Sequence, residues 1–90
     1  MKRAVITVIG KDMIGILAKV SNICSKRNIN IIDVSQTVLS DVFAMIMLVD
    51  LEKMDGSYDV LKTELENSGK DLGLSIHIMR EEIFNSMHNI

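Results

Sequence analysis

Ninety residues, at 10.1 kDa, suffice for one small domain, which excludes enzymes built from separate cofactor and substrate domains. A hydrophobic fraction of 48% and a charged fraction of 24% are typical of a folded chain rather than a disordered one. A net charge of −2 and only three aromatic residues (Phe43, Tyr58 and Phe84) argue against nucleic acid or an anionic membrane as partner.

The first segment predicts a strand, a loop and a helix. Residues 3–9 are rich in β-branched side chains, which indicates a strand. Gly10 and Gly15 flank a tight loop. Residues 14–27 then place apolar side chains at helical spacing, so an amphipathic helix is expected to end near Asn28.

The middle of the chain predicts a β-hairpin. Residues 30–39 and 42–51 both have strand composition, and Ser40 and Asp41 between them suit a turn. The second of these strands is apolar on both faces until Asp50. This pattern is typical of a central strand, or of a strand whose second face is covered.

The last third predicts a helix, a strand and a tail. Ser57 offers an N-cap for the helix, which is expected to end at Gly69 or Gly73. Residues 74–80 alternate as a strand. Residues 81–90 form a tail with apolar side chains at helical spacing.

The order βαββαβ predicts an α+β fold, the ferredoxin-like sandwich, with a four-stranded antiparallel sheet and two helices on one face. We expect a single domain over residues 1–90, with a core at about 3–80 and the tail at 81–90. The other sheet face is then bare, and we assign to it one apolar row: Phe43, Met45, Met47 and Val49. Monomers rarely expose such a row, so this face is expected to be an oligomer interface or to be covered by the tail.

The loop between Gly10 and Gly15 is the segment most suited to binding. It precedes a helix, whose first N–H groups could donate hydrogen bonds to a carboxylate or a phosphate. A triphosphate-binding loop is excluded, because Ile16 and Leu17 follow the second glycine where lysine and a hydroxyl residue would be needed. A turn that simply requires glycine torsions is the alternative.

Three segments resemble a known family: residues 6–18 (ITVIGKDMIGILA), 33–38 (DVSQTV) and 83–90 (IFNSMHNI). Together with the βαββαβ order, they are similar to the ACT domain, and in particular to small stand-alone ACT proteins of bacteria and archaea. The resemblance covers the whole chain.

The resemblance implies a regulatory role, in which a small molecule, usually an amino acid, binds at the interface between two protomers. Carried over by position, the loop contacts would be Gly10, Lys11, Asp12, Met13, Ile14, Gly15 and Ile16, with Asn30 and Ile31 facing them from the partner. Backbone N–H groups of Ile14 to Ile16 would then receive a ligand carboxylate. Asp12 would pair with its ammonium group, and Asn30 would make one orienting hydrogen bond.

Other reactive residue types have simpler interpretations. Cys24 falls on the apolar stripe of the first helix and is expected to be buried, not nucleophilic. His77 is expected on the open sheet face as a surface or interface residue, with metal binding or pH sensing as alternatives, and His88 in the solvated tail. Met45 and Met47 suit interface packing better than soft-metal binding. No catalytic set, metal site or cofactor is predicted.

Two functions follow from these features. The first is a non-enzymatic regulatory module, a homodimer or higher homo-oligomer that binds an amino acid and acts on a regulated protein partner. The second is a ligand-free assembly or adaptor domain that recruits a partner protein through its open sheet face. A cytoplasmic location is expected, because the chain has one cysteine and neither a signal-peptide pattern nor an apolar run long enough for a membrane span.

Overall fold

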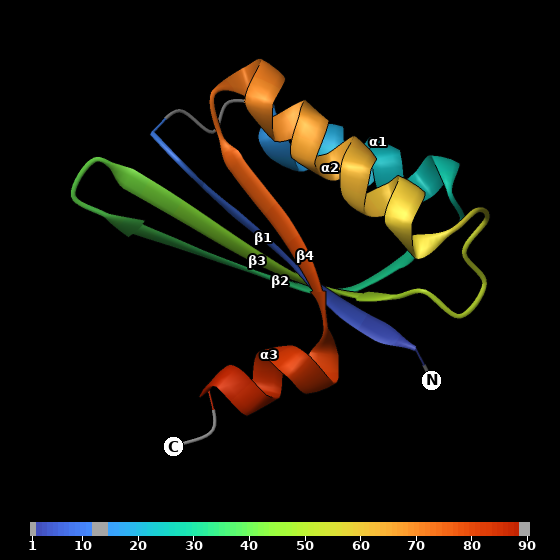
Figure 1. Ribbon diagram of the computed structural model, residues 1–90. Coiled ribbons are helices and arrows are strands. Elements are labelled where there is room, and N and C mark those ends of the chain that lie inside the picture. Colours follow the sequence, from blue (N-terminus) through green and yellow to red (C-terminus); the bar gives the residue numbers. More distant parts are fainter. Residues whose placement is uncertain (1, 12–14, 89–90) are drawn as a thin grey trace.

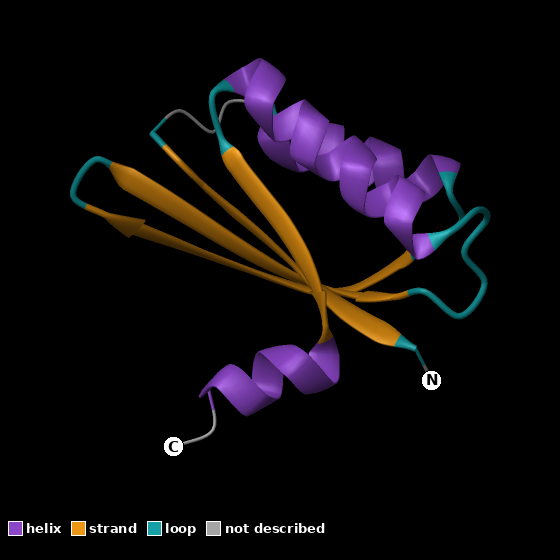
Figure 2. Ribbon diagram, in the orientation of Figure 1, coloured by secondary structure: helices purple, strands orange, loops and turns teal. Residues whose placement is uncertain are grey.

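The chain folds in the predicted order of strands and helices (Figures 1 and 2). The structure is a computed structural model, and it describes residues 2–11 and 15–88. The elements are β1 (Arg3–Gly10), α1 (Ile16–Lys26), β2 (Asn30–Leu39), β3 (Val42–Asp50), α2 (Tyr58–Leu72), β4 (Ser75–Arg80) and α3 (Glu81–His88). No helix among the described residues is long and apolar enough to cross a membrane.

The four strands form one antiparallel sheet in the order β2-β3-β1-β4. Helices α1 and α2 cover one face of this sheet, and α3 lies on the opposite side (Figure 1). This arrangement confirms the predicted α+β ferredoxin-like sandwich. Within the tail, the apolar side chains at helical spacing belong to α3 (Glu81–His88).

The core lies between the sheet and the helix pair. Its sheet side comes from alternate residues of the two central strands and from β4, and all are buried: Ala4, Ile6, Val8, Met45, Met47, Val49, Ile76 and Ile78. Its helix side comes from α1 and α2: Ile16, Val20, Ile23, Cys24, Leu61 and Leu65. The buried methionines of β3 are fully inaccessible to solvent, as are Leu61 and Leu65 of α2.

The assignment of Phe43, Met45, Met47 and Val49 to the open face is therefore wrong. Met45, Met47 and Val49 are 0% exposed, and Phe43 is partly buried against the core. The register explains the error, because Met47 lies opposite Ile6 and Val49 opposite Ala4, on the side of β1 that faces the helices. Both faces of β3 are apolar, so alternation within that strand could not show which face meets α1 and α2.

β2 contains a bulge that the alternation of residues 30–39 does not reveal. The register shifts between Ile31, which pairs with Val49, and Asp33, which pairs with Leu48. Ile31 and Val34 consequently lie on the same side and pack against the core, whereas Ile32 stays 42% exposed. One extra residue on a strand has this effect, because it moves the following side chains to the other face.

Local capping fixes the ends of α2. The Ser57 side chain accepts a hydrogen bond from the Val60 N–H at 3.2 Å, as the sequence predicts for its N-cap. Gly73 ends the helix with a φ of 71°, so the helix continues through Gly69. Gly69 is glycine for a different reason, because a Cβ there would lie 2.8 Å from the Leu74 carbonyl oxygen.

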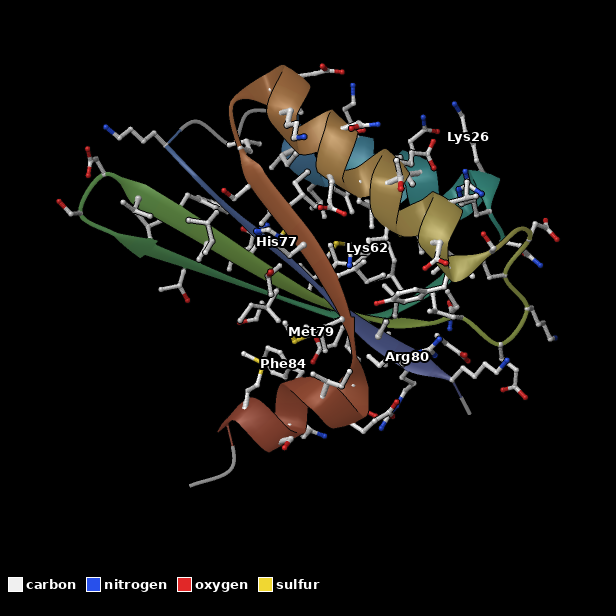
Figure 3. The ribbon with its side chains drawn as sticks, viewed as in Figure 1. Lys26, Lys62, His77, Met79, Arg80 and Phe84 are labelled. Atoms are coloured by element: carbon white, nitrogen blue, oxygen red, sulfur yellow. The ribbon has the colours of Figure 1, made fainter. Side chains whose placement is uncertain are left out.

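Helix α3 covers part of the sheet face opposite the core. It contacts β1 and β4, and Val5, which points to this side of β1, is only 3% exposed. Arg3 Nε donates to Glu81 Oε1 at 2.9 Å, which ties the first residue of β1 to the first residue of α3. Phe84 projects from α3 toward the sheet, on the side of Met79 (Figure 3). The tail thus covers this end of the face.

Candidate functional site

The first half of the candidate site is the loop between β1 and α1. Gly10 is the last residue of β1, Lys11 follows it in an exposed position, and Gly15 is the N-cap of α1. Ile16 is the first residue of α1 and is buried in the core. The other three loop residues of the predicted site lie outside the described residues: Asp12, Met13 and Ile14.

The N-terminus of α1 presents backbone N–H donors next to Gly15. Gly15 has a φ of 75° and no side chain that could accept from the first turn, and this turn contains no acidic residue. The first N–H groups of a helix lack partners within the helix, and the helix dipole adds positive charge there. No heavy atom of the described residues lies within 4 Å of a Cβ built on Gly15. A carboxylate could therefore approach these donors.

Gly10 has a structural reason to be glycine. A Cβ built on this residue would overlap Cδ2 of Leu74 and lie 3.2 Å from its Cγ. Leu74 itself is buried in the core. The Leu74 side chain thus fills the space beside Gly10, and a side chain at position 10 would require Leu74 to move, so this glycine serves packing.

Replacing Gly10 by Ala is expected to lower the free energy of unfolding by about 1–3 kcal/mol, because Leu74 must leave its position in the core. Urea unfolding followed by circular dichroism measures this change. In a Leu74→Ala background the same Gly10→Ala change should cost less, since the clashing atoms are absent. An equal cost in both backgrounds would show that contact with Leu74 is not the cause.

The second half of the candidate site lies at the other end of the sheet. Asn30 pairs with Asp50, and Asp50 pairs with Arg3, the first residue of β1. The loop follows Gly10, at the opposite end of β1 from Arg3. By the strand rise, Arg3 and Gly10 lie about 23 Å apart. Within the described part of one copy, the structure does not bring Asn30 and the loop together. Ile31, the other predicted partner residue, packs against the core.

Asn30 lines a polar cavity of about 340 Å³, within the range of small-molecule pockets. Its lining residues are Asn28, Ile29, Asn30, Asp50, Glu52 and Lys53. Asn28 Nδ2 donates to the Lys53 carbonyl oxygen at 3.1 Å, and Asp50 Oδ1 accepts from the Glu52 N–H at 2.9 Å. The cavity therefore presents carboxylates, amides and one ammonium group in a wall that hydrogen bonds hold in place.

The sequence does not predict most of this cavity. Asn28, Asp50, Glu52 and Lys53 come from two connections that are more than twenty residues apart, and only the sheet register brings them together. One local signal was present. Asn28, expected only as a helix stop, has a φ of 59°, a conformation that asparagine tolerates better than most residues.

The remaining candidate residues are placed without a ligand role. Cys24 is 1% exposed, and burial raises the pKa of its thiol to about 11, so the thiolate nucleophile does not form near neutral pH. This confirms that Cys24 is a small core residue. His77 lies opposite Thr7 on the face away from the core and is exposed. Across the described residues, no cluster of three or more His, Cys, Asp or Glu could hold a metal ion.

The family model of the ACT domain matches residues 2–79, which is almost the whole chain. The chain belongs to the ACT domain family. ACT domains are regulatory ligand-binding modules found in amino acid-sensing proteins, and they commonly form oligomers.

Relatives and solved structures are similar to nearly the whole of this chain. The UPF0237 protein lin0537 of Listeria innocua is 52% identical over 88 residues, which cover 98% of this chain and 99% of that protein. The structure of an ACT domain protein from Streptococcus pneumoniae is similar with a TM-score of 0.80 at 38% identity, and the match covers 92% and 93% of the two chains. A structure described as a putative glycine cleavage system transcriptional repressor is similar with a TM-score of 0.71 at 27% identity, over 88% of this chain and 45% of that one.

Proposed function

We propose that this ACT domain is a non-enzymatic regulatory module that binds an amino acid between two copies of the chain. The observation that carries the proposal is the N-terminus of α1, which suits a carboxylate, beside Gly15, where a Cβ would meet no atom of the described residues within 4 Å. The polar cavity beside Asn30 supplies the complementary half, because its Asp50 and Glu52 carboxylates suit an ammonium group. An amino acid is the ligand class that carries both charges.

Two copies can join these halves if their β2 strands pair antiparallel. β2 is an edge strand, so one side of its backbone is free to pair with another strand. Such pairing sets the Asn30 end of one β2 beside the Leu39 end of the other. The latter end leads into the β2–β3 turn, where Asp41 Oδ2 lies 3.9 Å from Lys11 Nζ of the loop. Loop and cavity then meet across the two-fold axis, and neither copy holds a complete site alone.

Ligand binding would shift the population of assembly states, because a site shared by two copies is complete only in the joined state. The glycine cleavage description of one similar structure makes glycine a first candidate. The alternative function, an adaptor domain without a ligand, is favoured by one observation only, the exposed apolar side chains of the sheet face away from α1 and α2.

A thermal-shift screen of the purified protein against the twenty amino acids and common nucleotides tests the proposal. A binder present at 100 times its dissociation constant stabilises by about 2.7 kcal/mol, which is a shift of several degrees for a domain of this size. A selective shift by one or a few amino acids is the expected result. The absence of any shift would favour the adaptor function instead.

Two site variants and one control test whether the ligand binds at the loop. Asp12→Ala and Gly15→Trp are expected to lose the ligand-induced shift, measured against each variant's own melting temperature. Gly73→Trp is the matched control, because Gly73 has a φ of 71° against 75° for Gly15, and a Cβ there also meets no described atom within 4 Å. Retention of the full shift by Gly15→Trp would show that the loop is not the site.

A further inference from the structure

A second cavity lies where the start of β1, the end of β4 and the connection from β3 to α2 come together (Figure 1). Its volume is about 220 Å³. One part of its lining is apolar, because Leu51 is buried in the core and Met54 and Tyr58 pack against that core. The other part is charged, with the cations of Lys2 and Arg80. The proposed amino acid site uses neither of these cations.

Arg80 is held over the ring of Tyr58. Its guanidinium carbon lies 4.7 Å from the centre of the ring, a distance typical of a cation–π contact. The ring itself is fixed at both ends, because Tyr58 is the first residue of α2 and its hydroxyl donates to the Ile78 carbonyl oxygen at 3.4 Å. A guanidinium that is already positioned loses less rotamer freedom on binding an anion, and its planar N–H groups match two oxygens of that anion.

The two cations of this cavity are available to a ligand. Among the described residues, no ion pair includes Lys2 or Arg80. The carboxylate next to Arg80 along the chain, that of Glu81, instead accepts from Arg3 Nε at 2.9 Å. Glu52 supplies the one carboxylate of the lining. The cavity therefore has two positive charges against one negative charge, which favours an anionic ligand.

The N-terminus of α2 adds positive potential to the same cavity. Gly56 and Tyr58 both line it and lie on either side of Ser57, the N-cap of the helix. The first N–H groups of a helix lack partners within the helix, and the dipole of a helix of 15 residues favours an anion at this end. Asp59 of the same turn is not part of the cavity lining. A cation pair and a helix N-terminus thus act on the same space.

We propose that this cavity binds a phosphate group, either as inorganic phosphate or as the ester of a small hydroxylated compound. A phosphate carries nearly two negative charges at neutral pH, which match the two cations, whereas a carboxylate carries one. Arg80 donates two parallel N–H bonds to the phosphate oxygens, and the Lys2 ammonium neutralises the second charge. When an ester binds, the Glu52 carboxylate accepts a hydrogen bond from its hydroxyl group. Glu52 is also the one residue that this cavity shares with the cavity beside Asn30.

Tyr58 provides a direct signal for the test. It is the one tyrosine of the chain, and the chain has no tryptophan, so intrinsic fluorescence reports on this cavity. Sodium phosphate added to the full chain at constant ionic strength is expected to change the fluorescence in a saturable way, whereas sodium acetate and sodium chloride are not. Isothermal titration calorimetry gives the dissociation constants independently. Tighter binding of glycerol 3-phosphate than of inorganic phosphate identifies an ester as the ligand, and equal or weaker binding identifies the free ion.

Variants at exposed positions locate the binding. Arg80→Ala is expected to weaken phosphate binding by about tenfold or more, since charge-assisted hydrogen bonds are lost. Arg80→Lys should recover part of the loss, because it keeps the charge but not the planar fork. Lys2→Gln should weaken binding about threefold. Lys62→Gln is the matched control, an exposed lysine of α2 that does not line the cavity, and should change the affinity by less than about twofold.

Three results would overturn the inference. The first is a wild type that binds neither phosphate compound, and the second is an equal response to acetate. The third is an Arg80→Ala variant that folds by circular dichroism and keeps the wild-type affinity, since phosphate would then bind elsewhere. Gly15→Trp separates this inference from the proposed function, because it is expected to lose the amino acid response and to keep the phosphate response. Loss of the phosphate response in Gly15→Trp would place the anion at α1 and reject the cavity.

Discussion

Replacing Met47 by Asp is expected to abolish the folded state. Met47 is 0% exposed and lies opposite Ile6 and Val34 in the sheet, on the side that meets the helices. No buried polar or charged residue occurs in the described core, so the new carboxylate would find no partner there. An unpaired buried charge costs several kcal/mol, which is comparable with the whole stability of a small domain. Far-UV circular dichroism and urea unfolding would show the loss.

The neighbouring residue provides the control. Ile46 precedes Met47 in β3 and points to the opposite face, where it is 41% exposed. The same substitution there, Ile46→Asp, should leave the far-UV spectrum and the folded state intact, because the carboxylate stays in contact with water. A Met47→Asp variant that unfolds at the wild-type urea concentration would mean that Met45 and Met47 face solvent and not the helices.

The order of elements could be predicted from the sequence because each element carries its own local signal. Ser57 caps α2 and Gly73 ends it, and β-branched runs identify the strands. Which face of β3 is buried could not be predicted in this way. Both of its faces are apolar, and hydrophobicity does not distinguish them: one has Phe43, Met45, Met47 and Val49, the other Val42, Ala44, Ile46 and Leu48. Only pairing with β1, where Ile6 faces the helices and Thr7 does not, determines which row is buried.

The candidate site, too, could be predicted only in part. The glycine loop was expected, because a short segment of the sequence carries the resemblance to ACT domains. The packing role of Gly10 depends on Leu74, which is sixty-four residues away along the chain, so no local pattern could show it. The cavity beside Asn30 likewise depends on the register of β2 with β3, including a bulge at Ile31 that alternation does not reveal.

Deleting residues 81–90 is expected to lower the free energy of unfolding by about 2–4 kcal/mol. Val5 would lose its cover on the sheet face, and Phe84 would no longer bury its ring against the sheet. Full burial of each such side chain is worth about 1.5–3 kcal/mol. The ion pair of Arg3 with Glu81 would be lost as well, although a half-exposed pair adds little. Urea unfolding of the shortened chain measures the sum.

Point variants separate the contact of α3 from the mere presence of extra chain. Phe84→Ala should reproduce part of the loss, about 1–2 kcal/mol, because its half-buried ring provides the apolar contact of the helix. Asn85→Ala, at an exposed position on the same helix, should change stability by less than about 0.5 kcal/mol. If the shortened chain unfolds at the wild-type urea concentration, the burial of Val5 does not depend on α3.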